Sequence, residues 1–168
     1  MFEITRGIGK LKGLMFGDNV GTLLRSVQLT LTNAQAKAFR ATPITIVGAP
    51  GAGKLIIPIT CNISLVYGGT NAFTQGGAGS NFSLKYKDGT TASLMTGGIG
   101  AFVQNTVSAF SLMVPAVAAG SEVNVTKANG DNQPLVVHNP AAAELTGNAG
   151  ADNTFVLNLV YQIIPSNV

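Results

Sequence analysis

Short segments in which apolar and polar residues alternate recur along the chain, and turn-forming residues separate them. The stretch SVQLTLT, residues 26–32, and the segment 155–164 both follow this two-residue period, which is typical of a strand with one buried face. The 21 glycines are best explained as turn markers between such strands. About eight or more short strands predict an all-β fold, and we expect an antiparallel β-sandwich of the jelly-roll type.

Apolar runs and turn signals place the other elements. Further strands are predicted at residues 44–47, 81–87, 106–114, 122–126 and 135–138, and residues 55–67 are predicted to form one long strand or two strands joined by a bend. Loops are predicted at 68–80, 97–102 and 139–153. Asp88 and Gly89 are predicted to form the two-residue turn of a hairpin whose return strand is residues 91–95. Asn129 and Gly130 are predicted to form the turn that closes the strand at 122–126.

One short helix is predicted, at residues 33–39. Thr32 and Gln35 have the spacing of a capping box, and three alanines in the following turns favour helix. Pro43 restricts the residue before it and requires the helix to end earlier. We therefore expect an all-β domain with one short helix of one or two turns.

The N-terminal segment differs from the rest of the chain. Residues 1–26 are predicted to form an extended basic arm, and residues 27–168 the β-sandwich domain, because five glycines within residues 1–21 disfavour a stable helix there. Buried apolar side chains contribute about 1.5–3 kcal/mol each and exposed ion pairs about 0–1, so adhesion of such an arm would be mainly apolar. The candidate partner-binding residues are Phe2, Ile4, Arg6, Lys10, Leu11, Lys12, Leu14 and Phe16.

The stretch ITIVGAPGAGKLI, residues 44–56, matches most of a phosphate-binding loop. The motif requires Ser or Thr after the lysine to bind magnesium and a helix to follow, whereas here Leu55 follows Lys54 and begins an apolar, β-branched run. Pro50 and Gly51 instead fit the two corners of a type II turn. We predict a hairpin that joins strands 44–47 and 55–67, with Lys54 exposed to solvent.

Catalytic constellations are missing from the sequence. His138 is the single histidine and Cys61 the single cysteine, and the seven carboxylates are scattered among turns. His138 is expected to be a structural or surface residue, and Cys61 a buried, unreactive thiol. These observations predict that the protein is not an enzyme and has no catalytic residues, cofactor or metal site.

Composition favours a protein that packs against other subunits. Charged residues make up 10% of the chain and hydrophobic residues 46%, whereas about a quarter of the residues of a soluble domain are usually charged. A homo-oligomer, dimer or trimer, is therefore expected. The basic residues are spread thinly without an aromatic stacking pattern, so no nucleic-acid partner is expected. The apolar runs are too short to span a membrane, so no membrane partner is expected either.

An ordered set of motifs resembles small virion proteins encoded among the structural genes of tailed bacteriophages. The motifs are LTLTNAQAKAFRATPITIVGAPGAGKLIIPI, LVYGGTNAF, FSLKYKDGT and QPLVVHNPAAAELTGNAGADNTFVLNLVYQIIP, between residues 29 and 165. The resemblance implies a jelly-roll structural protein, most simply a capsid cement or decoration protein that binds the major capsid protein on the outer capsid surface of the virion and is made in the host cytoplasm. The alternative is a tail or head-fibre component that acts as a receptor-binding or adaptor module.

Overall fold

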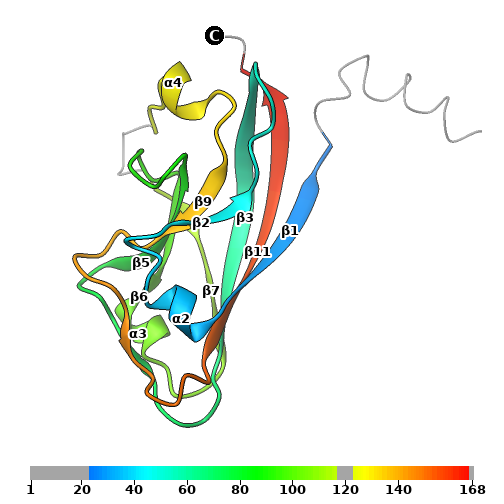
Figure 1. Cartoon of the computed structure of the whole chain (residues 1–168). Coiled ribbons are helices and arrows are strands. Elements are labelled where there is room, and N and C mark those ends of the chain that lie inside the picture. The colour runs from blue at the N-terminus through cyan, green and yellow to red at the C-terminus, as the bar shows by residue number, and fades with distance from the viewer. Residues whose placement is uncertain (1–22, 117–122, 167–168) are drawn as a thin grey trace, which may run out of the picture.

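Two antiparallel sheets lie on either side of one hydrophobic core in the computed structural model, which describes residues 23–116 and 123–166 (Figure 1). The four-stranded sheet has the order β1 (Arg25–Leu31), β11 (Thr154–Pro165), β3 (Lys54–Val66) and β7 (Ala109–Leu112). The five-stranded sheet has the order β2 (Ile44–Val47), β9 (Leu135–His138), β5 (Ser80–Tyr86), β6 (Met95–Ile99) and β8 (Val114–Pro115). The remaining elements are the β4 (Phe73–Thr74) and β10 (Thr146–Gly147) pair and the helices α2 (Asn33–Ala36), α3 (Gly100–Val103) and α4 (Lys127–Gly130).

Alternating strands fill the core as their sequence predicts. In β11, Phe155, Leu157 and Leu159 are buried, whereas the residues between them are only half-buried. Aromatic rings from separate elements meet at Phe155, whose ring centroid lies 4.9 Å from that of Phe82 and 5.0 Å from that of Phe73. The all-β antiparallel class and the strands predicted at residues 26–32, 44–47, 55–67, 81–87, 135–138 and 155–164 are confirmed within a residue or two.

The predicted helix is present but short. Thr32 accepts a hydrogen bond from the backbone N–H of Gln35, and the Gln35 side chain accepts one from the backbone N–H of Thr32, which completes the capping box. The helix α2 ends at Ala36 and not at residue 39, because the chain turns there to bury Phe39 against Phe82, with ring centroids 5.0 Å apart.

The expectation of a single helix was wrong, because the described residues contain three. Residues 97–102, predicted as a loop, instead complete β6 and form most of α3, which buries Phe102 and Val103. In the region predicted as strand 122–126, residues 123–126 are not in a strand, and Asn129 and Gly130 belong to α4. The errors at residues 97–102 and 129–130 come from treating glycine and asparagine as turn markers only, and the error at 122–126 comes from the alternation of apolar and polar residues in EVNVT.

β5 and β6 pair as an antiparallel hairpin, but both its predicted two-residue turn and its predicted return strand, residues 91–95, are wrong, because β6 begins at Met95. The innermost pair of β5 and β6 is Leu84 opposite Met95, and residues 87–94 form a longer connection between the two strands. Within it the Thr91 hydroxyl donates to the Tyr86 carbonyl at 3.0 Å and accepts from the Tyr86 N–H at 3.1 Å. This side chain takes the place of the strand partner that a tight hairpin would supply.

The chain between β2 and β3 is a turn but does not form the predicted hairpin. Gly51 has a φ of 101°, as the type II turn requires, and β3 begins at Lys54 without an intervening helix. However, β2 pairs with β9 in one sheet, whereas β3 pairs with β11 and β7 in the other. The turn therefore carries the chain from one sheet to the other.

A bulge in β3 accommodates its proline. The register of β3 with β11 shifts where Thr60 lies opposite Val160 and Pro58 opposite Tyr161, which leaves Ile59 as the extra residue. Proline has no N–H to donate to a ladder and is tolerated in sheets at bulges and edges. The predicted strand 55–67 is thus one long strand with a local irregularity.

The sheet begins slightly before the predicted domain boundary. Arg25 and Ser26, assigned to the arm by sequence, pair with Tyr161 and Val160 as the first residues of β1. Leu23 and Leu24 precede the strand and are exposed. Residues 1–22 lie outside the described residues, so the division into arm and domain stays a prediction.

Candidate interaction surface

The four-stranded sheet has one face in the core and one that points away from it, which we call the outer face. Residues directly opposite each other in antiparallel register share a face of the sheet, so the register assigns the members. They are Ser26, Gln28 and Thr30 of β1, Thr154, Val156, Asn158 and Val160 of β11, Thr60, Asn62, Ser64 and Val66 of β3, and Phe110 and Leu112 of β7.

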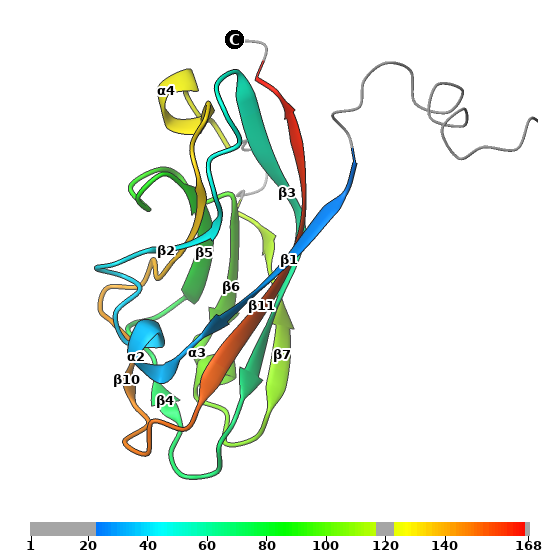
Figure 2. The ribbon, with the colours of Figure 1, turned by 45° about the vertical axis from the view of Figure 1, so that its right-hand side comes forward.

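The outer face is uncharged. Its residues carry hydroxyl, carboxamide, aliphatic or aromatic side chains, and Gln28 Nε2 donates to Asn158 Oδ1 at 2.8 Å in its middle. All of these residues are exposed or half-buried, and no element of the described chain covers the face (Figure 2). Sheet faces that contact only water usually carry charged residues for solubility. This face is therefore suited to bury against another protein without removing charges from water.

The edge of the sheet at β7, which we call the open edge, is apolar. The side chain of Phe110 is 72% exposed and that of Leu112 is 64% exposed. Val107 and Val114, just outside the strand, are also exposed, so apolar side chains continue along the chain into β8. Large apolar side chains gathered on an edge strand are uncommon in monomeric proteins and mark interaction sites.

The five-stranded sheet contrasts with this arrangement. Ser83 and Val136 lie on its side away from the core, as the pairing of β5 with β9 shows, yet both are buried. Nearby, Arg40 and Ala41 donate their backbone N–H groups to the Glu144 carboxylate, and Arg40 Nε donates to the Ala141 carbonyl at 2.7 Å. Loop residues of the chain thus hydrogen-bond to one another near this side of the five-stranded sheet. The four-stranded sheet presents the more accessible face.

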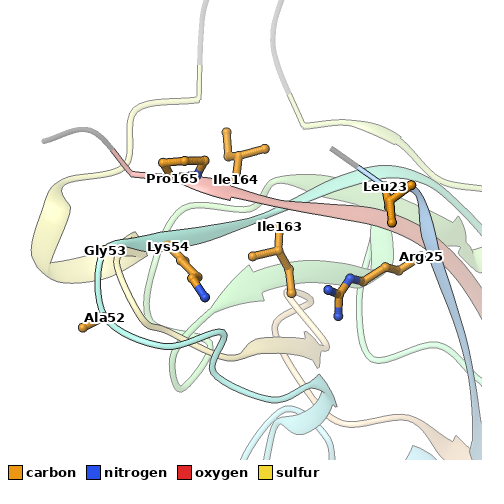
Figure 3. Close-up of a pocket in the computed structure, with 8 residues that line it drawn as sticks. All are labelled: Leu23, Arg25, Ala52, Gly53, Lys54, Ile163, Ile164 and Pro165. Atoms are coloured by element: carbon orange, nitrogen blue, oxygen red, sulfur yellow. The ribbon is translucent and has the colours of Figure 1, made fainter. Parts of the chain in front are cut away.

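A second feature is an open hollow of about 340 Å³ near the start of β1 and the end of β11. Figure 3 shows Arg25, Lys54 and Ile163 on the same side of the ribbon, around this hollow. Among the described residues that line it, Arg25 and Lys54 are cationic and none carries a carboxylate. The lining residues are Leu23, Arg25, Ala52, Gly53, Lys54, Ile163, Ile164 and Pro165. The hollow can therefore accept an anionic group of a partner beside an apolar one.

The phosphate-loop motif lies at the border of this hollow, but its geometry differs from a nucleotide site. The backbone N–H of Gly51 donates to Asn132 Oδ1 at 2.8 Å, so it is not free to bind phosphate. Lys54 is exposed at the start of a strand, as predicted. Helix N-terminal amides, which hold phosphate in such loops, have no counterpart in the strand that follows.

We expect Lys54→Ala to leave the binding of the protein to its partner unchanged within about twofold, because Lys54 is exposed and single surface charges contribute little. The wild-type protein is also expected to show no magnesium-dependent ATP binding in isothermal titration calorimetry. Micromolar ATP binding that the Lys54→Ala variant lacks would contradict the assignment of this segment as a turn.

The two residues with reactive side chains that the sequence singled out lie away from the outer face. Cys61 is buried as predicted, and burial raises the pKa of its thiol to about 12. His138 is half-buried, and its pKa is lowered by burial and by the nearby Lys85 and Arg40. Its Nδ1 is buried without a hydrogen-bond partner among the described residues.

The arm residues predicted to bind a partner lie outside the described residues: Phe2, Ile4, Arg6, Lys10, Leu11, Lys12, Leu14 and Phe16. Their role in binding stays a prediction. What the sequence did not predict is the outer face, although the alternating uncharged polar residues in SVQLTLT and in VLNLVYQ, residues 156–162, were a signal for it. The exposed Phe110 and Leu112 were likewise predicted only as part of a strand.

The described residues contain neither a grouped set of metal ligands nor a long apolar helix. Within residues 23–116 and 123–166, no three or more His, Cys, Asp and Glu side chains are grouped so that they could hold a metal ion. The helices in these ranges are all too short to cross a membrane. In comparisons with known proteins, no family model matches the chain and no curated protein is found to be similar to it.

Proposed function

We propose that the protein is a structural component of a bacteriophage virion, a capsid cement or decoration protein that binds the shell of the major capsid protein at its outer surface and stabilises it. In this proposal the two sheets form a jelly-roll sandwich, and the protein is made in the host cytoplasm before it binds the particle. The resemblance of the motifs between residues 29 and 165 supports this function, and the outer face supports a role in protein–protein contact.

The uncharged outer face is the observation that carries the proposal. Desolvating a charged group is costly unless it is paired, and the core of a protein interface is depleted of charged residues. Val156, Asn158 and Asn62 at the centre of the outer face meet this condition, and the amides can hydrogen-bond to a partner. A surface of this kind can bind an array of subunits.

Binding of this type stabilises the assembled shell by mass action. A protein that binds the assembled state and not free subunits adds a stabilisation that grows with its concentration relative to its dissociation constant. The two cations at the hollow, Arg25 and Lys54, add modest attraction to an acidic shell. Because no residue of the outer face is charged, binding through it is expected to depend weakly on salt.

A charge placed on the outer face tests the proposal. We expect Val156→Glu, which lies between Thr30 and Ser64 in the sheet, to weaken co-sedimentation with stripped particles by about tenfold or more, since burying an unpaired carboxylate costs more than about 1.4 kcal/mol. Ala128→Glu, an exposed position of α4, is the matched control and is expected to bind as the wild type does. Equal binding of Val156→Glu and Ala128→Glu would exclude the outer face as the contact surface.

The same co-sedimentation assay tests the arm. Deleting residues 1–21 is expected to leave a folded, soluble protein that binds much more weakly, and added salt alone is expected to have a smaller effect.

The copy number of the protein in purified particles distinguishes a place in the shell from a place in a tail or head fibre. Hundreds of copies indicate the capsid, whereas a few copies indicate a tail or head fibre and would contradict a cement role.

A further inference from the structure

His138 lies on the side of the five-stranded sheet that faces away from the core, among loop residues of the chain. The register places it opposite Ser83, so its side chain shares this side of the sheet with Lys85, its diagonal neighbour on β5. Gly89 lies against the ring, because a Cβ added there would come within 2.8 Å of His138 Cδ2 and within 2.9 Å of Pro43 Cγ. The ring is therefore packed on by two segments besides its own strand.

One nitrogen of this ring is placed where a proton would be costly. Nδ1 of His138 is buried and has no hydrogen-bond partner among the described residues. Both ring nitrogens carry a hydrogen in the protonated imidazole, so protonation would turn Nδ1 into a charged donor that is buried without an acceptor. A buried charged group without a partner costs more than a neutral one. The geometry therefore favours the neutral ring.

Three charged side chains face the ring: Lys85 of β5, Arg40 of the segment between α2 and β2, and Glu144 of the loop after β9. Lys85 Nζ donates to the Gly89 carbonyl at 2.9 Å, which holds it close to the ring. Burial, followed by the charges of Lys85 and Arg40, lowers the pKa of His138, and the Glu144 carboxylate and the Arg40 backbone oppose this shift to a smaller extent. A proton on the ring would thus add a third positive charge to two.

The contact that we call the Arg40–Glu144 clasp joins two loops beside the ring. The Glu144 carboxylate accepts from the backbone N–H groups of Arg40 and Ala41 at 3.0 and 2.7 Å, and Arg40 Nε donates to the Ala141 carbonyl at 2.7 Å. Arg40 and Ala41 are exposed. Exposed hydrogen bonds of this kind can open while the core stays folded.

We propose that His138 makes the Arg40–Glu144 clasp sensitive to protons, so that the clasp is closed while the ring is neutral and opens when the ring takes up a proton. Opening gives the charged ring access to water and moves Arg40 away from it. The state that binds the proton more strongly gains population as pH falls. The stabilisation from the neutral ring is therefore complete above the ordinary histidine pKa of about 6.5 and is lost as pH falls below it, toward the lower folded value.

The chain contains a single histidine, which makes a direct titration possible. The ring signals of His138 in untagged protein are followed by NMR as pH is varied, in the folded protein and in the urea-unfolded protein. We expect the midpoint to be lower in the folded protein, and Lys85→Gln, which removes one of the two facing cations, to raise it. A folded midpoint equal to or above the unfolded one would overturn the proposal.

Amide hydrogen exchange tests the opening itself. Between about pH 7.5 and about pH 5.5, we expect the protection factors of the Arg40 and Ala41 amides to fall by about threefold or more in the wild type, and to stay within about 1.5-fold in His138→Gln, whose side chain takes up no proton. The Leu157 amide in the middle of β11 is the internal control and is expected to keep its protection.

Two outcomes would contradict the clasp. Equal loss of protection at Arg40 and Ala41 in the wild type and in His138→Gln would show that another group controls the opening. Equal loss at Leu157 would show that acid unfolds the whole domain and not the clasp. Lys85→Gln supplies a second variant that keeps the histidine, and its clasp amides are expected to lose protection at lower proton concentration than those of the wild type. Unchanged pH dependence in Lys85→Gln would also count against the proposal. All of these measurements use purified protein, so their results do not depend on the proposed virion function.

Discussion

Replacing Phe155 by alanine is expected to lower the free energy of unfolding by about 3–5 kcal/mol, the usual cost of removing a large buried aromatic side chain. Phe155 is fully buried, and its ring contacts those of Phe73, Phe82 and Phe102 at centroid distances of 5.0, 4.9 and 6.1 Å. It therefore joins the loop strand β4, the sheet strand β5 and the helix α3 to β11. Its removal leaves a cavity that rings from three elements border.

Chemical denaturation followed by circular dichroism measures this loss. Phe110→Ala is the matched control, because the same side chain is removed from an exposed position, and we expect it to change the free energy of unfolding of the monomer by no more than about 0.5 kcal/mol. Destabilisation of similar size in the two variants would contradict the assignment of Phe155 to the centre of the core.

Replacing Asn148 by alanine is expected to lower the free energy of unfolding by about 2–5 kcal/mol, since buried polar groups that lose a partner cost about 1–3 kcal/mol each. Asn148 is buried, accepts hydrogen bonds from Asn33 and from Asn153 N–H, and donates to the Asn71 carbonyl and to Asp152 Oδ1 at 2.7 Å. Its φ of 42° is also a conformation that asparagine tolerates better than alanine.

The Asn148 network also makes stability depend on pH. Hydrogen bonds from Asn148 and Thr70 lower the pKa of Asp152, so its contribution is present above the unfolded pKa of about 3.9 and is lost as pH falls through the lower folded value. We expect acid to destabilise Asn148→Ala less than the wild type over this range. Gln28→Ala, which removes an exposed amide with one side-chain partner, is the control and should keep the wild-type pH profile. A steeper acid loss in Asn148→Ala would contradict this account.

Local sequence patterns predicted where the strands lie, but they did not predict which strands pair with each other. SVQLTLT and the capping box at Thr32 depend on residues a few positions apart, and both were confirmed. The hairpin between β2 and β3 failed because Ile44 pairs with Val137, far along the chain. Short-range signals cannot specify which distant strand completes a ladder.

The prediction was wrong at Gly98, where glycine is required by close packing and not by a turn. Gly98 was assigned to a loop, yet it lies in β6 with a φ of 63°, and a Cβ there would come within 2.4 Å of the Phe82 ring. The outer face could not be predicted either, because it depends on strand register. Its residues are ordinary polar side chains in four separate segments, and only the register of β1, β11, β3 and β7 brings them onto one uncharged surface.

The proline bulge in β3 restricts where a foreign strand can attach to this molecule. β7 covers β3 only from Asn62 to Leu65, so the stretch of β3 before the bulge is a second place where a strand could add in line with β7. Pro58 has no N–H to offer there, the carbonyl of Lys54 accepts from Asn132 N–H, and that of Ile56 accepts from the Tyr86 hydroxyl. That stretch of β3 therefore offers fewer free backbone groups to a foreign strand, which limits open-ended pairing along it.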